Sequence, residues 1–302
     1  MKSRRLIRGE KHHWWPACIS KLWANEDGIV HRITSNGYVQ PISPNKLARI
    51  SDGHNIVVGK EGSPFDGTFE HEFDDADTWF PAVVNWLDGL KHHTPTEIPF
   101  QSGYYFPQNS EREQLSRLCV CLVSLAIRSP TFRNETTLLI NSLMQSYKPG
   151  KKELKTIMAA NMVGKLKETS ESLFGSGKFI VLFSDSVEFI FGDGFYHNIS
   201  MNGVRCSPDV RILMPLTPTM AVLYVRPMVL TPEPRIMTRL AERDLVELIN
   251  ETVQVYSREY LFYRSDKPEL REFFVRGEHL VYSTNDPIDN LVDSIPGVQR
   301  FL

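Results

Sequence analysis

Apolar side chains in the middle of the chain recur at the spacing of a buried helix. The pattern predicts a core helix over residues 115–127. Pro130 ends this helix and starts a second one, because proline suits the first helical turn and the Ser129 hydroxyl suits the N-cap. Four residues define the buried face at i, i+3, i+4 and i+7: Leu115, Leu118, Cys119 and Leu122.

Two further helices are predicted on either side of this pair. Three acidic residues, Asp74, Asp75 and Asp77, precede an apolar stretch, and acidic charge is favourable at a helix N-terminus. Residues 79–90 are therefore predicted to be helical. Another helix is indicated before Gly175 by four apolar residues: Leu154, Ile157, Met158 and Met162.

The last third of the chain changes to strand-like patterning. Short runs rich in Val, Ile and Phe, each bounded by turn residues, predict strands over residues 179–183, 187–191, 210–216 and 220–225. Helical spacing returns over residues 238–258.

The N-terminal segment has a mixed pattern. Residues 16–23 are predicted to form a short helix. Residues 28–34 and 38–42 are predicted to form a hairpin around Ser35-Asn36-Gly37, a strong turn signal. A second short helix is predicted over residues 45–50.

These patterns predict an α+β fold with a helical middle packed against a mostly antiparallel sheet and a small N-terminal hairpin region. Residues 1–70 make up the N-terminal segment, and residues 71–302 make up the helical and sheet core. We expect the two to fold as one continuous globular unit.

Composition narrows the classes of function. The formal net charge of the 302 residues is −2, which excludes a global basic field, so a nucleic acid would have to bind a local patch. No apolar run approaches the roughly 20 residues of a membrane span, so we expect no membrane association. The four cysteines form no C-x-x-C pair, and the N-terminus has no apolar signal core, which favours reduced thiols and a cytoplasmic location.

Four short motifs occur in a fixed order along the chain. They are His12-His13-Trp14-Trp15-Pro16, Arg128-Ser129-Pro130-Thr131-Phe132-Arg133, Met214-Pro215-Leu216-Thr217-Pro218 and Ile249-Asn250-Glu251. In this order they resemble the domain-of-unknown-function family 4238, over residues 11–264. The family label carries no activity. The resemblance implies a fold, candidate site residues and a setting in bacterial conflict, such as phage defence or a toxin.

One segment departs from the family pattern. Where the family carries a strand ending Thr-Ser-Asp-Asn-Pro, this chain has Phe191-Gly192-Asp193-Gly194-Phe195, which keeps only the acid. If that motif contributes to a site, the resemblance implies an altered or inactive one. Asp193 is a candidate metal ligand, or alternatively a turn former, because aspartate tolerates the backbone angles of a turn.

The adjacent histidines His12 and His13 are candidate catalytic residues. The pKa of imidazole lies near neutral pH, which suits a general base, and imidazole is also a common metal ligand. Adjacent histidines before a proline resemble the opening of His-Asn-His nucleases. Asn45 and His54 have the Asn-to-His spacing of that motif, but the 32 positions from His13 to Asn45 exceed what the compact motif allows. The alternative is that the two histidines close a turn against the neighbouring tryptophans.

Two arginines flank the predicted start of a helix, where backbone N–H groups and the helix dipole favour an anion. Arginine also binds phosphate through two parallel hydrogen bonds. Arg128 is therefore a candidate catalytic residue, and Arg133 is a candidate substrate-binding residue, as is Asn250 of the last family motif. The alternative for both arginines is pairing with the protein's own carboxylates.

These residues support two hypotheses. The first is a metal-dependent phosphodiesterase, and in particular a nuclease, that uses Mg²⁺ or Zn²⁺ and acts on nucleic acid or a nucleotide. The second is a non-catalytic module that binds a ligand or a protein partner encoded nearby, which the altered segment at Asp193 favours. An enzyme would place His13, Arg128 and Asp193 in one cleft, whereas a binding module need not. Five basic residues near the N-terminus could steer a polyanion: Lys2, Arg4, Arg5, Arg8 and Lys11.

Overall fold

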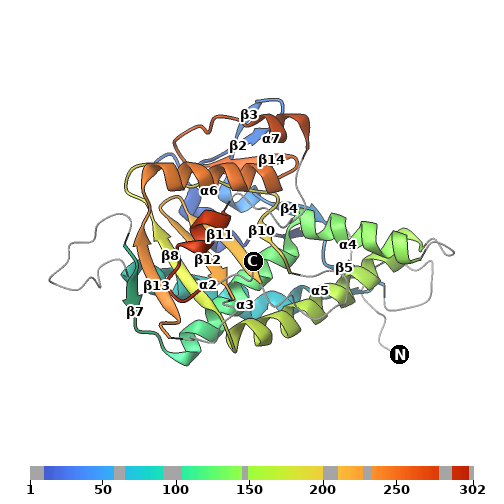
Figure 1. The fold of residues 1–302 in the computed structure, drawn as a ribbon. Coiled ribbons are helices and arrows are strands. Elements are labelled where there is room, and N and C mark those ends of the chain that lie inside the picture. The colour runs from blue at the N-terminus through green and yellow to red at the C-terminus, as the bar shows by residue number, and fades with distance from the viewer. Residues whose placement is uncertain are drawn as a thin grey trace.

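A six-stranded sheet forms the centre of the molecule (Figure 1). The computed structural model describes residues 10–57, 65–90, 104–144, 149–199, 210–226, 233–278 and 288–298. Neighbouring strands are antiparallel except β8 and β13, which are parallel. In spatial order the strands are β10 (Tyr196–His197), β11 (Arg211–Thr217), β12 (Met220–Val225), β8 (Lys178–Phe183), β13 (Ile236–Leu240) and β7 (Phe106–Gln108).

The middle of the chain is helical, as predicted. The predicted core helix is confirmed within α3, which packs against α2 and α5. The Ser129 hydroxyl caps α4 by accepting a hydrogen bond from the backbone N–H of Phe132 at 3.2 Å. These helices are α2 (Asp74–Leu90), α3 (Arg112–Arg128), α4 (Pro130–Leu143) and α5 (Lys151–Phe174).

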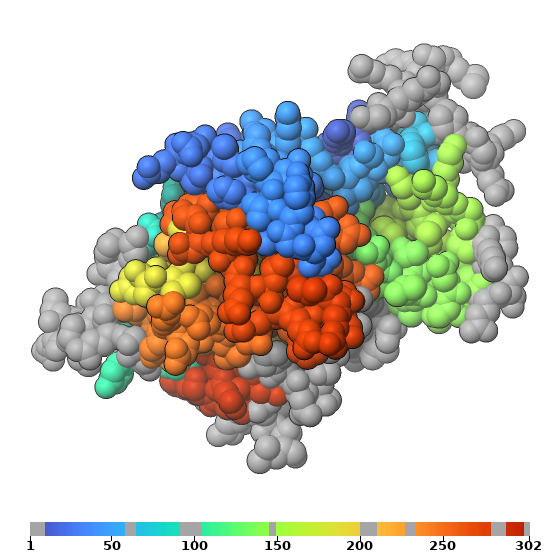
Figure 2. Space-filling view, turned by 90° about the horizontal axis from the view of Figure 1, so that it is seen from above, coloured from blue at the N-terminus to red at the C-terminus, as the bar shows by residue number. Residues whose placement is uncertain are grey.

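A four-stranded sheet lies on the other side of α6 (Figure 1). It joins the N-terminal hairpin to a C-terminal strand, and Figure 2 shows these two ends of the chain side by side. In order it contains β3 (Val39–Ile42), β2 (Val30–Thr34), β14 (Tyr260–Tyr263) and β9 (Phe191–Gly192). The nearby helices are α6 (Arg243–Tyr256), α7 (Glu272–Arg276) and α8 (Asp289–Asp293).

Two small two-stranded sheets complete the described fold, together with three 3-10 turns and a short helix. One sheet pairs β1 (Lys11–His13) with β4 (Arg49–Ser51), and the other pairs β5 (Asn55–Ile56) with β6 (Gly67–Thr68). The remaining elements are α1 (Ala17–Ser20), η1 (Lys21–Trp23), η2 (Pro44–Lys46) and η3 (Glu70–Phe73).

The N-terminal segment contributes aromatic side chains to the main core. The Trp15 ring stacks on Phe191 with centroids 4.4 Å apart. The Trp23 indole N–H donates to the carbonyl of Leu216, in β11, at 3.0 Å. Residues on both sides of position 70 therefore share one apolar core.

Three local predictions from the sequence were wrong. Residues 45–50 do not form a helix, because the chain leaves the turn η2 at Leu47 in an extended conformation and then pairs as β4 with β1. Of residues 187–191, only Phe191 joins a strand. The helix predicted over 238–258 begins at Arg243, because the preceding residues form β13 and pair with β8.

Among the described helices, none is by itself long and apolar enough to cross a membrane. The helices α3 and α4 meet the length and composition test only as a pair, and a bend of 62° separates them.

Candidate metal centre

Three segments that are distant in sequence meet beside the N-terminus of α2. Strand β1 carries His12, the turn after β4 carries His54, and η3 carries Glu70. The donor atoms of these three side chains all lie within 4.8 Å of one another, so the group could hold a metal ion. Among the described residues it is the one group of His, Cys, Asp and Glu side chains with such spacing.

The two histidines are buried, and three of their four ring nitrogens lack a hydrogen-bond partner in the described part of the chain. Each is 1% exposed, and their ring centroids are 4.9 Å apart. Neither ring nitrogen of His12, nor Nδ1 of His54, has a hydrogen-bond partner in the described part of the chain. A buried polar atom without a partner costs about 1–3 kcal/mol, and a bound metal ion would satisfy one atom on each ring.

Two carboxylates reach His12 from the surface. Glu70 Oε2 lies 3.4 Å from His12 Nε2, and Glu10 Oε2 lies 3.6 Å from it. Donor atoms around a tetrahedral Zn²⁺ ion are about 3.4 Å apart, given metal–ligand bonds of about 2.0–2.1 Å. The His12–Glu70 pair already has this spacing, and no other pair of donor atoms, all within 4.8 Å, must approach by more than about 1.4 Å.

The surroundings of His54 keep its ring neutral. Its ring lies 5.0 Å from that of Phe69 and 5.2 Å from that of Phe73, between centroids. Burial lowers the pKa of His54 far below its usual value, and the nearby charges of Arg133 and Arg128 lower it further. Neutral imidazole is the form that binds metal ions, so this site does not lose His54 as a ligand through protonation near neutral pH.

Two basic side chains hold the turn that carries His54. Arg133 Nη1 donates to the carbonyl of Gly53 at 2.9 Å, and Lys155 Nζ donates to the carbonyl of Asp52 at 2.7 Å. Asp52 itself has a positive φ of 52°, a left-handed conformation that aspartate tolerates better than most residues with a side chain. These two donors therefore reinforce a turn that the Asp52-Gly53 sequence also favours.

His13 is separated from His12 by the geometry of the strand. Successive side chains of a strand point to opposite faces, so the two histidines of β1 cannot both face the metal centre. His13 Nε2 accepts a hydrogen bond from Arg49 Nε at 3.1 Å. Burial and the Arg49 charge lower the pKa of His13, and the charges of Asp77 and Arg128 are close enough to act on it as well.

Arg128 is paired with one of the protein's own carboxylates. Its guanidinium makes two parallel hydrogen bonds to Asp77, Nη2 to Oδ1 at 2.6 Å and Nη1 to Oδ2 at 3.2 Å. The same guanidinium lies 4.7 Å from the centroid of Phe73. Because Arg128 is 1% exposed, it is positioned to orient the start of α2 rather than to meet a substrate from solvent.

Arg133 is buried without a carboxylate partner in the described part of the chain. Its Nε donates to the carbonyl of Arg128 at 3.2 Å, and its Nη2 has no partner there. Burial, assisted by the Arg128 charge, lowers its pKa to about 10. The guanidinium therefore stays protonated near neutral pH and supplies a fixed positive charge behind His54.

Asp193 lies outside this group. Its carboxylate accepts hydrogen bonds from the backbone N–H groups of Arg258 at 2.8 Å and Glu259 at 3.0 Å, where α6 leads into β14. Burial raises its pKa to about 6 in spite of these bonds. The flanking Gly192 and Gly194 are required by close packing, because a side chain at either position would collide with the end of α6. These contacts give Asp193 a structural role in joining the segment after β9 to the end of α6.

Asn250 also makes structural contacts. Its amide N–H donates to the carbonyl of Glu188 at 2.9 Å, and its amide oxygen accepts from the N–H of Ile190 at 3.0 Å. The side chain thus ties α6 to the segment before β9. Both ends of the amide are engaged, so a substrate would have to displace these bonds.

The sequence indicated part of this centre and missed the rest. His12 was a candidate from its motif, and His54 was noticed through its spacing from Asn45, which is exposed in η2 and lies outside the group. Glu70 had no sequence signal. It joins the site only because β1 pairs with β4 and η3 folds back toward them.

Comparison with family models, curated proteins and solved structures finds no match to this chain. The resemblance to family 4238 therefore stays a prediction.

Proposed function

We propose that this protein is a metal-dependent phosphodiesterase whose divalent metal ion is held by His12, His54 and Glu70. The observation that carries the proposal is the pair of buried histidines with unpartnered ring nitrogens, which lie within metal-ligand spacing of a carboxylate. Two imidazoles and one carboxylate are a donor set that suits Zn²⁺ and leaves a coordination position open. Mg²⁺ prefers oxygen ligands, so we propose Zn²⁺.

The carboxylates on one side of the centre support a divalent ion. Glu70 and Glu10 supply two negative charges beside His12, which oppose the positive charges of Arg133 and Arg128 near His54. When bound, the ion would polarise the phosphoryl oxygen and activate a water molecule. Glu70 keeps half of its side chain exposed, so a substrate can approach from that side.

The substrate phosphate is proposed to reach the metal ion from the exposed side of Glu70. Lys11 and Arg49 are exposed on the paired strands β1 and β4, but they share the face of His13, which is opposite to that of His12. The phosphate is therefore not expected to contact these two cations while it is bound to the ion.

A non-catalytic module is the second candidate, and the pairing of Arg128 with Asp77 favours it. In that case the metal ion would only stabilise the fold by linking three chain segments. Both candidates predict the same metal binding, but only the phosphodiesterase predicts that the protein hydrolyses a substrate.

Hydrolysis of bis(p-nitrophenyl) phosphate and of a single-stranded DNA oligonucleotide tests the proposal. With Zn²⁺ we expect cleavage that chelation abolishes and that His12→Gln lowers by about 10²–10⁴-fold. His71→Gln is the matched control, because His71 is exposed in the same 3-10 turn as Glu70 and is not part of the group. Metal binding without cleavage of either substrate would reject the phosphodiesterase and leave the binding module.

A further inference from the structure

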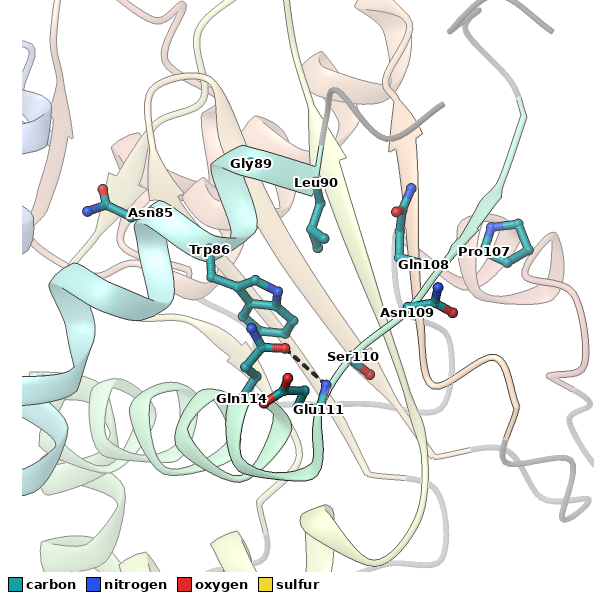
Figure 3. A pocket seen from close by; sticks show the side chains of 10 residues that line it. All are labelled: Asn85, Trp86, Gly89, Leu90, Pro107, Gln108, Asn109, Ser110, Glu111 and Gln114. Carbon is teal, nitrogen blue, oxygen red and sulfur yellow. Dashed lines mark hydrogen bonds between the residues drawn. The ribbon is translucent and has the colours of Figure 1, made fainter. Parts of the chain in front are cut away.

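A cleft opens at the other end of α2, far from the metal centre. We call it the α2–β7 cleft; it is formed by residues 85–90, residues 107–111 and Gln114, and it encloses about 860 Å³ (Figure 3). The 17 residues of α2 span about 25 Å, which separates this cleft from the group at the N-terminus of the helix. In Figure 1, β7 accordingly lies on the left and β4 and β5 lie on the right.

The cleft combines an aromatic ring with hydrogen-bonding groups that have no protein partner. Figure 3 shows the Trp86 indole inside the cleft, close to the Gln114 amide. Within the described part of the chain, the side chains of Asn85, Trp86, Asn109 and Ser110 make no hydrogen bond to protein, and Asn85 and Asn109 are exposed. Gln114 uses its amide oxygen to accept from the N–H of Glu111 at 3.0 Å, which leaves its amide N–H groups for a ligand.

A second hollow beside α6 encloses about 480 Å³ and is lined by charged and amide side chains. There Arg243 pairs with Glu247 at 2.8 Å, and both ends of the Asn250 amide are bonded to backbone. Unlike the α2–β7 cleft, this hollow is lined by several charged side chains of both signs.

The charge of the α2–β7 cleft restricts its ligand. The charged side chain in its lining is Glu111, whose carboxylate caps the N-terminus of α3 by accepting from the backbone of the third helical residue. A carboxylate in that place disfavours an anion at the helix end. The part of a ligand that enters the cleft is therefore not an anion, and it must offer a flat face to Trp86 and donors and acceptors to amide groups.

We propose that the α2–β7 cleft binds a nucleobase. Every base has a face that stacks on an aromatic ring, and side-chain amides pair with base edges, most favourably with adenine. An adjoining hollow of about 460 Å³ shares residues 108–110 with the cleft and contains Arg112. A base in the cleft would thus leave its sugar in the adjoining hollow and a phosphate near Arg112. The base comes either from a free nucleotide or from an unpaired position of a nucleic-acid strand.

Calorimetric titration of the full chain with adenosine, cytidine, guanosine and uridine tests this inference. The buffer contains EDTA, so that the result does not depend on the metal centre or on the proposed phosphodiesterase. We expect saturable binding of adenosine that Trp86→Ala weakens by about 5- to 150-fold, the effect of losing one base–aromatic stack. Asn109→Ala is expected to weaken binding by about 5-fold, the effect of losing one hydrogen bond.

Trp79→Ala is the matched control, because Trp79 lies two turns earlier on α2, under Arg117, and should leave binding unchanged. Tighter binding of an oligo(dA) hexamer than of adenosine assigns the base to a strand, and equal affinities assign it to a free nucleoside or nucleotide. Absence of saturable binding for all four nucleosides would overturn the inference. The inference would also be overturned if neither Trp86→Ala nor Asn109→Ala weakened nucleoside binding. Binding of glucose by a protein that binds no nucleoside would overturn it as well.

Discussion

His54 packs against the rings of Phe69 and Phe73 and lies near two guanidinium groups, and these neighbours determine its protonation. The only sequence signal for this residue was its spacing from Asn45. The charges that act on it come from Arg133 and Arg128, about 75 to 80 positions later in the chain. A contact of that kind depends on tertiary folding, so local sequence patterns could not predict it.

The lowered pKa of His54 predicts a stability that falls in acid. The unfolded chain binds a proton at His54 near pH 6.5, whereas the folded chain does not, so unfolding takes up a proton below that pH. The free energy of unfolding should decrease by about 1.4 kcal/mol per pH unit for each such histidine. His197, whose pKa burial lowers to about 4, adds the same dependence between pH 6.5 and 4.

Urea unfolding at pH 7, 6 and 5 measures this dependence. His54→Gln should give a shallower slope than the wild type, and so should His197→Gln. Equal slopes for all three proteins would show that the two rings titrate normally in the fold.

The Arg128–Asp77 pair predicts an asymmetric response to mutation. Asp77→Ala leaves a buried guanidinium without its counter-charge, which costs about 3–5 kcal/mol of stability. Arg128→Met leaves only an aspartate that is 42% exposed and can be hydrated, so its cost should be clearly smaller. Urea unfolding of the two variants measures both values. A larger loss for Arg128→Met than for Asp77→Ala would contradict the structural role of this pair.

At the scale of elements, the helices with a strong apolar period were predicted well. The period identifies α3 because one whole face of that helix is buried against α2 and α5. The prediction failed where pairing overrides local propensity. Residues 238–240 were included in the predicted helix, but they form the end of β13. They do so because all three pair with β8 and Thr238 also pairs with β7. Likewise, β1 has only three residues and no distinguishing pattern, yet it positions His12.

The buried face of α3 predicts a large effect of truncating one side chain. Leu118 is fully buried, so Leu118→Ala should lower the free energy of unfolding by about 2–5 kcal/mol. Leu138→Ala in α4 is the control, because Leu138 is 62% exposed and its truncation should cost less than about 0.5 kcal/mol. Equal losses in denaturant unfolding would place Leu118 outside the core.

At the scale of the whole molecule, the N-terminal and C-terminal segments build one core around Trp15, Trp23 and Phe191. The sequence predicted the α+β class, because helical and strand-like periods occupy different thirds of the chain. It did not predict that β14 joins the N-terminal hairpin, since a pairing across more than 200 residues leaves no local signal. The candidate metal centre depends on the same long-range folding.

This packing also predicts how the thiols react. Cys18, Cys119 and Cys121 are unpaired, and Cys206 lies outside the described residues. Burial raises the pKa of Cys119 to about 12 and raises that of Cys121 as well. With Ellman's reagent at pH 8, both should react much more slowly than Cys18 in the native protein. All four cysteines should react after unfolding, and two missing thiols would reveal a disulfide.

The central claim is that His12, His54 and Glu70 bind one divalent ion, and calorimetric titration of the metal-free full chain with Zn²⁺ tests it most directly. The wild type and His71→Gln should each bind one ion per chain with the same affinity. His12→Gln, His54→Gln and Glu70→Gln should each weaken binding by at least about 10-fold, as loss of a metal ligand or its support does. Stoichiometric binding that survives all three substitutions, or no binding by the wild type, would contradict the claim.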